Sequence, residues 1–300
     1  MNAQTPGQPL PPKKDRRETA RESARLMREE QKKREKRNKL FLRGGIGLAL
    51  VAIAAIVAVL IVGSVKPPSP GPLNMASDGV LMQGDGTTIS AVPTAATAAD
   101  AEPVATDVSA LTDTVNITVY LDYLCPYCNQ FETTNAAQLT SWLTAGNITL
   151  ETHPISILDQ SSNGTKYSTR SANAAACVAN YQPDSFLDVN SALFASQPTE
   201  GTSGLTDDEL VSLVQDAGVT DEAVATCITD QTFSGWVKDA TDRALKGPLP
   251  NTELAAVTGT PTVLVQGVQY TGALDDAAAF EAFVMEQATA TADDSTDSGE

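Results

Sequence analysis

The fold is decided by the stretch from Val115 to Cys128, which reads VNITVYLDYLCPYC. Its first nine residues are rich in β-branched and aromatic side chains, which is typical of a buried strand. Apolar residues at near-helical spacing follow the second cysteine as far as Thr144, and Gly146 ends that pattern. Two cysteines, three positions apart, are therefore expected where a strand passes into the N-terminus of a helix.

That position favours a reactive thiol. The N–H groups of the first turn and the helix dipole stabilise an anion, which lowers the pKa of an exposed thiol at Cys125. Pro126 has a fixed φ and no N–H, so it suits the first turn of a helix. Cys128 lies about one turn further in, less exposed and close enough to bond to Cys125. The pattern predicts a reversible dithiol–disulfide pair with one attacking and one resolving sulfur.

A zinc site is the alternative for two cysteines at this spacing, because they are half of a common ligand set. The other two cysteines, Cys177 and Cys227, stand alone and far apart in the sequence, so they do not complete a zinc ribbon. Redox chemistry is therefore favoured, with neither a metal nor another cofactor.

Charge divides the chain into two unequal parts. Residues 1–43 contain 14 Lys and Arg against 6 Asp and Glu, a net charge of +8. Residues 44–300 contain 6 Lys and Arg against 31 Asp and Glu, a net charge of −25. An acidic body of this size argues against nucleic acid as a partner, and the basic head needs a separate explanation.

The segment 44–65, GGIGLALVAIAAIVAVLIVGSV, contains no charged residue and is long enough to cross a bilayer core of about 30 Å as a helix. Lys and Arg crowd its N-terminal side, so the positive-inside rule places residues 1–43 in the cytoplasm and the rest outside, where disulfides persist. A cleaved signal peptide is the alternative, but its basic leader would be shorter and a small-residue cleavage site should follow. We expect a single-pass anchor in the cell membrane.

Three segments are predicted to lie outside the main domain. Residues 1–43 form a basic cytoplasmic segment, either held on anionic lipid or simply a solvated helix that fixes the topology. Residues 66–110 form an extracytoplasmic linker with a small hairpin around Gly84-Asp85-Gly86. Residues 288–300, acidic and rich in Ser, Thr and Ala, form a disordered tail.

Residues 111–287 are predicted to form one α/β domain. Thr206 and Glu209 are spaced as a capping box at the start of one of its helices. The elements expected after the first strand and helix are, in chain order, a strand over 147–157, a helical block over about 168–247, two short strands around Gln266-Gly267 and a final helix over 275–287.

Taken together, these features resemble the thioredoxin fold: CPYC after an apolar strand, a helical insertion, and Gly259-Thr260-Pro261-Thr262 before the last strand pair. The insertion resembles that of the DsbA-like thiol–disulfide oxidoreductases. The anchor and the second cysteine pair are similar to membrane-tethered versions from actinobacteria. The resemblance implies an α/β thioredoxin fold with an all-helical insertion, preceded by a single transmembrane helix.

The resemblance also implies roles for the residues of the motif. Cys125 would be the nucleophile and Cys128 the resolving thiol, while Pro126 and Tyr127 would help to set the reduction potential. Tyr127 stands where the strongest oxidases often have His. Many thioredoxin-like enzymes carry a buried acid six residues before the first cysteine, and here that position is Val119.

Further implications concern residues distant from the motif. The bond between Thr260 and Pro261 would be cis and would lie beside the cysteines, where its backbone pairs with the substrate chain. Cys177 and Cys227 lie in the helical block, outside the cytoplasm and without metal partners, so we expect a structural disulfide that closes a loop of about 50 residues.

Two other polar residues have competing interpretations. His153, the single histidine, is either a base that approaches the cysteines or, as we expect, a strand residue near a sheet edge. Asp122 is either a group that assists proton transfer or, as we expect, a solvated acid at the end of a strand.

The sequence therefore predicts an extracytoplasmic oxidase that introduces disulfides into reduced exported proteins. A thiolate stabilised at a helix N-terminus favours the reduced form, which makes the disulfide a strong oxidant. A quinone-linked membrane partner would reoxidise it. The alternatives are a reductase or isomerase that receives electrons across the membrane, and a non-catalytic, membrane-tethered chaperone or binding module whose CPYC is a structural disulfide.

Overall fold

The computed structural model describes residues 22, 25–29, 32–34, 70–99, 101–111 and 114–297, of which the last seven are described by backbone alone. The chain divides into two compact units, Met1–Lys66 and Pro67–Glu300, and all that follows concerns the second. The predicted transmembrane helix over 44–65 lies outside the described residues, as does most of the basic segment. None of the helices in the described ranges is long and apolar enough to cross a membrane.

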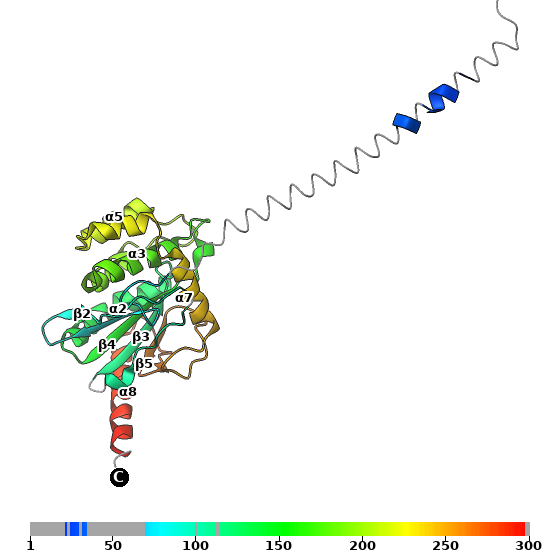
Figure 1. Ribbon diagram of the computed structural model, residues 1–300. Helices are drawn as coiled ribbons and strands as arrows, with labels where there is room; N and C mark the ends of the chain where they lie inside the picture. The colour runs from blue at the N-terminus through cyan, green and yellow to red at the C-terminus, as the bar shows by residue number, and fades with distance from the viewer. Residues whose placement is uncertain are drawn as a thin grey trace, which may run out of the picture. The chain divides into compact units, whose positions relative to one another are not determined.

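A mixed sheet of six strands forms the centre of the second unit (Figure 1), in the order β2-β1-β4-β3-β5-β6. Strands β3 and β4 run parallel, and every other neighbouring pair runs antiparallel. The strands are β1 (Val80–Gly84), β2 (Ile89–Ala91), β3 (Val115–Leu121), β4 (Ile148–Pro154), β5 (Thr262–Val265) and β6 (Val268–Gln269).

Strand β3 lies between β4 and β5 because both of its faces are apolar. Val119 and Leu121 belong to the larger of two hydrophobic clusters, which also contains the buried face of the following helix. Tyr120 points to the opposite face, since side chains alternate along a strand, and belongs to the smaller cluster with Leu264. A strand buried on both faces has a fixed position in the sheet. It therefore also fixes the residues that follow its C-terminal end, Asp122 to Cys125.

Helices cover both faces of this sheet (Figure 1). On one face α2 (Pro126–Thr144) packs beside α8 (Ala277–Asp297), where the rings of Phe131 and Phe280 meet edge to face with centroids 5.1 Å apart. On the other face α7 (Ser234–Lys246) brings Ala244 into the cluster of Tyr120.

The predicted helical insertion is confirmed between β4 and β5. The capping box at the start of α5 is present as well, with Thr206 and Glu209 bonded reciprocally. The structure joins Cys177 of α3 to Cys227 of α6 by a disulfide. The remaining helices are α3 (Tyr167–Tyr181), α4 (Phe186–Ala195), α5 (Asp207–Asp216) and α6 (Glu222–Thr229), with 3-10 turns η1 (Val108–Ala110), η2 (Asp159–Ser161) and η3 (Pro183–Ser185).

The small hairpin expected between Gly79 and Ser90 is present as β1 and β2, but it does not belong to a separate linker. Strand β1 pairs with β4 and extends the domain's own sheet. The physical reason is that Val80 and Met82 are apolar and wholly buried. Gly84 permits the close approach to α2, because a Cβ there would lie 1.7 Å from the carbonyl oxygen of Leu143.

The C-terminal segment also differs from the expectation. The sequence predicts a disordered tail over 288–300, whereas the backbone of α8 is helical as far as Asp297. Alanine recurs at Ala288, Ala290 and Ala292, and alanine is the strongest helix former. The low hydrophobicity that suggested disorder does not oppose the continuation of a helix already nucleated by its packed first turns.

Candidate active site

Cys125 is the N-cap residue of α2, with an extended backbone at φ −75° and ψ 118°. Its carbonyl accepts the N–H of Asn129 (3.2 Å), and its own N–H donates to the carbonyl of Asp122 (2.9 Å). Pro126 occupies the first helical position, where the missing N–H removes no intrahelical bond. The local sequence thus fixes the Cys125 sulfur at the positive end of a 19-residue helix.

The pKa of Cys125 is lowered to about 6. Hydrogen bonding by the Cys128 thiol is the largest cause, and it outweighs burial, which acts in the opposite direction. The Thr260 side chain and the N–H groups of Cys128 and Tyr127 lower the pKa further. Cys125 is therefore largely a thiolate at neutral pH, which is the nucleophilic form.

Cys128 has the opposite character. Both thiols are buried, with Cys125 4% and Cys128 2% exposed, so the expectation of an exposed thiol at Cys125 is wrong. At Cys128 burial first, then the proximity of Cys125, raises the pKa of the thiol well above the usual value. The N–H of Asp122 lies 3.5 Å from its sulfur. Cys125 and Cys128 are both free thiols here. The pair can therefore hold one proton and one negative charge, with the charge on the outer sulfur.

The loop before β5 brings Thr260 and Pro261 to the cysteines, although these residues are far apart in the chain. The Cys125 sulfur lies 3.2 Å from the carbonyl oxygen of Thr260, and the Thr260–Pro261 peptide bond is cis. Pro261 lines a narrow space together with Cys128.

Pro126 and Tyr127 lie at the surface between the two cysteines. The Tyr127 ring is 63% exposed, although its neighbours Cys125 and Cys128 are buried. Tyr127 therefore offers an apolar contact directly beside the reactive sulfur.

Asp122 is wholly buried, so the expectation of a solvated acid is wrong. One carboxylate oxygen accepts the N–H of Leu124 and the other accepts the N–H of Leu158, each at 2.9 Å. Burial raises the pKa of Asp122 to about 6, against these two hydrogen bonds, and the Cys125 charge acts in the same direction as burial. The loop around Leu158, whose position the sequence does not reveal, closes over the strand end.

Asp122 thus supplies a buried acid three residues before Cys125. The position six residues before Cys125, where many thioredoxin-like enzymes carry such an acid, is Val119, which packs in the core. An acid with a pKa of about 6 can give or take a proton at neutral pH.

Two residues that lie close to the cysteines, Glu132 and Gln197, were not predicted from the sequence. Glu132 lies one helical turn after Cys128 and lines the same narrow space. Burial raises the pKa of its carboxyl, and Ser191 of α4 donates to it at 3.1 Å. The spacing of four residues from Cys128 on one helix was the signal that could have identified it.

The second is Gln197, just beyond α4 in the helical insertion. Its side-chain amide donates to the carbonyls of Tyr123 (3.0 Å) and Cys125 (2.9 Å). Its oxygen accepts from Asn129 of α2 (3.2 Å). No sequence signal connects Gln197 to the motif, because the contact depends on how the insertion folds back.

His153 does not join this site. It lies in β4, between β1 and β3, so the expected position near a sheet edge is also wrong. Its ring stacks on Tyr120 with centroids 4.4 Å apart, and its Nε2 lies 3.5 Å from Glu151. The described residues include no group of three or more His, Cys, Asp or Glu that could hold a metal ion.

The chain is similar to a known protein family and to proteins of known structure. A family model described as Thioredoxin matches residues 112–285, and no curated protein matches the chain. The oxidised DsbA of Mycobacterium tuberculosis is 25% identical over 70% of this chain and 92% of its own, with a TM-score of 0.52. The reduced DsbA of the same organism is 24% identical over 72% of this chain and 98% of its own, with a TM-score of 0.52. The reduced DsbG of the same organism is 29% identical over 57% of this chain and 77% of its own, with a TM-score of 0.48.

Proposed function

This chain belongs to the thioredoxin family, and from that membership we propose that it is a DsbA-like thiol–disulfide oxidoreductase that introduces disulfides into exported proteins. The observation that carries the proposal is the contrast between the two thiols of CPYC. Cys125 has a pKa of about 6, whereas the buried Cys128 has a pKa well above the usual value. This contrast supports Cys125 as the nucleophile and Cys128 as the resolving thiol.

The proposed reaction starts from a Cys125–Cys128 disulfide. A substrate thiolate attacks the sulfur of Cys125, the bond between the cysteines breaks, and Cys128 leaves as a thiolate that takes up a proton. A second substrate thiolate then attacks the substrate sulfur of the mixed disulfide, and Cys125 leaves as a thiolate. The substrate gains one disulfide and the enzyme gains two electrons.

Asp122 is the proposed source of the proton that Cys128 takes up. Its main-chain N–H lies 3.5 Å from the Cys128 sulfur, and its buried carboxyl, whose pKa is about 6, interacts electrostatically with Cys125. Tyr127 and the loop at Thr260 and Pro261 are the proposed contacts of the substrate chain, because they flank the reactive sulfur.

The stabilised thiolate of Cys125 supports electron flow from the substrate to the enzyme. A stabilised thiolate lowers the free energy of the reduced enzyme, so its disulfide is a stronger oxidant. A low Cys125 pKa therefore favours oxidation of the substrate. Reoxidation then requires an electron acceptor, for which we propose a quinone-linked membrane partner. The substrates would be reduced exported proteins.

The test is the reduction potential of the CPYC pair, measured against glutathione with the full chain. We expect a value near that of DsbA, about −120 mV, and activity in the refolding of a reduced disulfide protein. Cys125→Ala abolishes this activity, and Cys128→Ala accumulates mixed disulfides. A value near that of thioredoxin, about −270 mV, would indicate a reductase instead. An ordinary Cys125 thiol without any such activity would indicate a binding module.

The proposed location is the outer side of the cell membrane, with the N-terminus in the cytoplasm. The uncharged segment 44–65 and its basic flank support this orientation. Protease treatment of intact cells should remove everything after about Pro67 and spare the basic segment. Recovery of a shortened, soluble protein from the medium would favour a cleaved signal peptide.

A further inference from the structure

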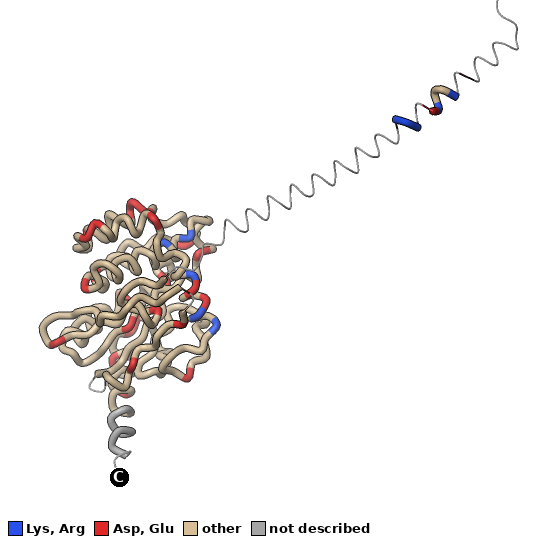
Figure 2. The backbone as a smooth tube through the Cα atoms, in the orientation of Figure 1, with Lys and Arg blue, Asp and Glu red and all other residues tan. Residues whose placement is uncertain are grey.

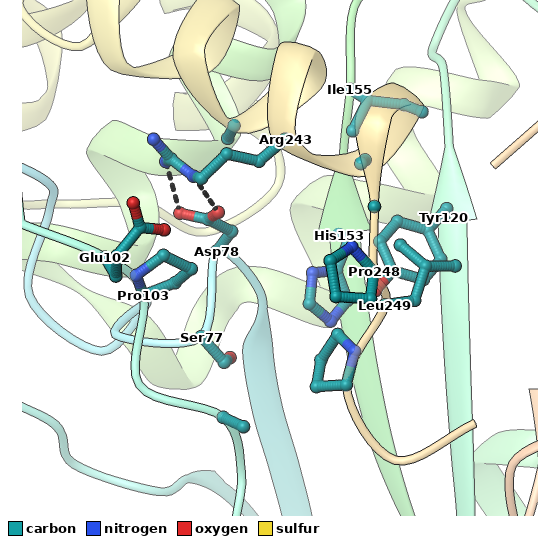
Figure 3. Close-up of a pocket in the computed structure, with 15 residues that line it drawn as sticks. Ser77, Asp78, Glu102, Pro103, Tyr120, His153, Ile155, Arg243, Pro248 and Leu249 are labelled. Atoms are coloured by element: carbon teal, nitrogen blue, oxygen red, sulfur yellow. Dashed lines mark hydrogen bonds and ion pairs between the residues drawn. The ribbon is translucent and has the colours of Figure 1, made fainter. Parts of the chain in front are cut away.

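A cavity of about 320 Å³ lies on the face of the sheet opposite α2, beneath α7 (Figure 3). Its floor consists of Tyr120 of β3 and His153 of β4, whose rings stack, together with Ile155. These side chains point away from the face that carries Val119 and Leu121, because side chains alternate along a strand. The cavity is therefore separate from the space beside Cys128.

The walls of this cavity are mostly apolar and flat. Pro248 and Leu249 line one side and Ala244 of α7 lines another, while Pro103 lies on a loop across the opening (Figure 3). The stacked rings of Tyr120 and His153 on the floor offer a flat surface against which a planar ring can pack. A cavity of this size lies at the lower end of the range found for small-molecule sites.

An ion pair between Asp78 and Arg243 lines the polar side of the cavity. Asp78 accepts two hydrogen bonds from Arg243, each of 2.7 Å, so the guanidinium charge is already neutralised (Figure 3). Glu102 lies next to this pair at the rim, and within the described part of the chain it makes no hydrogen bond or ion pair of its own. The rim thus carries two carboxylates, those of Asp78 and Glu102, against the one guanidinium of Arg243, whose pKa both of them raise.

A buried carboxylate adds to this negative field. Glu151 lies beside His153, and despite its burial, His153, Ser77 and Thr106 lower the pKa of its carboxyl. The three carboxylates of Asp78, Glu102 and Glu151 outnumber the cationic groups whether His153 is charged or neutral. In a cavity with apolar walls, such an imbalance favours a positively charged ligand. Figure 2 shows that Asp and Glu are spread over the rest of the domain too.

Three buried polar atoms without a hydrogen-bond partner lie in this cavity or in the adjoining one, although one of them, Nε2 of His153, is 3.5 Å from Glu151. Nε2 of His153 is one of six such side-chain atoms in the described residues. Two others, Oγ1 of Thr97 and Nε1 of Trp236, line an adjoining cavity that shares Glu102 and Arg243 as walls. Native structures satisfy most buried polar atoms, so Thr97 and Trp236 leave two polar atoms available to another molecule in the adjoining cavity.

We propose that this cavity binds a small organic cation, in which a planar apolar ring carries an amidinium or ammonium group. The ring lies over Tyr120 and against Pro248 and Leu249, and the cationic group faces Glu102. Charge-assisted hydrogen bonds to the carboxylate supply the selectivity.

Benzamidine is a suitable probe because it has this shape and charge, and benzamide and benzoate are its neutral and anionic counterparts. We expect calorimetric titration of the full chain to give a dissociation constant for benzamidine of about 1 mM or lower. Benzamide should bind about tenfold more weakly, and benzoate should not bind at a measurable level. Equal binding of benzamide, or no saturable binding of benzamidine, would overturn the proposal.

Two variants locate the binding. Glu102 is exposed, so Glu102→Gln should fold normally, weaken benzamidine about tenfold and leave benzamide unchanged. Ala244→Leu fills this cavity but not the adjoining one and should weaken both ligands. Glu253→Gln, at an exposed carboxylate outside the cavity, is the matched control and should change nothing. An unchanged affinity in Glu102→Gln would show that benzamidine binds elsewhere. An unaltered reduction potential of the CPYC pair checks that each variant is folded.

Discussion

The side-chain amide of Gln197 donates a 2.9 Å hydrogen bond to the main-chain carbonyl of Cys125. This contact joins the helical insertion to the N-cap of the helix that carries both redox cysteines. Asn129 donates to the oxygen of the same amide, which fixes its orientation. The insertion therefore does more than cover the sheet, because it holds the backbone on which the reactive sulfur stands.

Gln197→Ala should loosen this backbone. Two carbonyls, those of Tyr123 and Cys125, lose a donor, which costs about 1–3 kcal/mol of stability. Gln197→Glu keeps the acceptor for Asn129 but places a negative charge beside Cys125, so the Cys125 pKa should rise further than in the alanine variant. The measurement is the pH dependence of Cys125 alkylation.

The control for Gln197 is Gln130→Ala, at an exposed position of α2, which should leave both stability and alkylation unchanged. If the Gln197 variants lose stability but keep the Cys125 pKa, the contact is structural and does not position the thiolate.

Asp122→Asn should change how stability depends on pH. The pKa of Asp122 is raised from 3.8 to about 6 in the folded state, so the wild type should lose about 3 kcal/mol as the pH rises from about 4 to above 6. The asparagine variant should lack this loss. Its amide cannot accept both backbone N–H groups, which adds a cost that does not vary with pH.

Urea unfolding of the oxidised protein between pH 4 and pH 8 measures the Asp122 effect, because the oxidised pair contributes no thiol titration. A wild-type profile as flat as that of Asp122→Asn would show that the carboxyl titrates normally. In the reduced enzyme, removal of the Asp122 charge should also lower the Cys125 pKa, since like charges raise one another's pKa.

Local signals in the sequence predicted the first strand and helix, the helical block and the capping box at Thr206, whereas the thioredoxin fold was implied by the resemblance to that family. Each of these local signals depends on residues within a few positions of one another, such as the alternation in β3 and the spacing of Cys125 and Cys128. The sequence of the hairpin around Gly84 was equally informative about the turn. It did not indicate the partner strand, because the pairing of β1 with β4 joins residues about 70 positions apart.

The polar residues of the site show the same limit. Asp122 has the sequence context of a solvated strand end, and only the closure of the loop at Leu158 buries it. His153 was expected near an edge because β1 was not assigned to the sheet, and adding β1 places β4 in the interior. Gln197 acts through hydrogen bonds to main-chain carbonyls, which leave no trace in residue type or spacing.

Removal of the second cysteine pair by Cys177→Ala and Cys227→Ala should destabilise the protein without affecting CPYC chemistry. The bond closes a loop with a sequence separation of 50 residues, for which chain entropy gives about 4 kcal/mol. Thermal unfolding of the double variant measures the loss, and an unaltered reduction potential serves as the control. Free thiols at both positions in the wild-type protein isolated from cells, detected by mass spectrometry, would contradict the prediction.

The rate of iodoacetamide alkylation of reduced protein should rise with pH around a midpoint near 6, because Cys125 has a pKa of about 6 and the buried Cys128 reacts slowly. The reduced protein should also become more stable as the pH rises from about 6 to about 9, because the pKa of Cys125 in the folded state lies below its usual value of 9.0. Thr260→Val keeps the side-chain shape but removes the hydroxyl, so the midpoint should move upward. Thr258→Val, at an exposed position of the same loop, should leave it in place. A midpoint near 8.5 in the wild type would mean that the helix N-terminus and the Cys128 thiol do not activate Cys125.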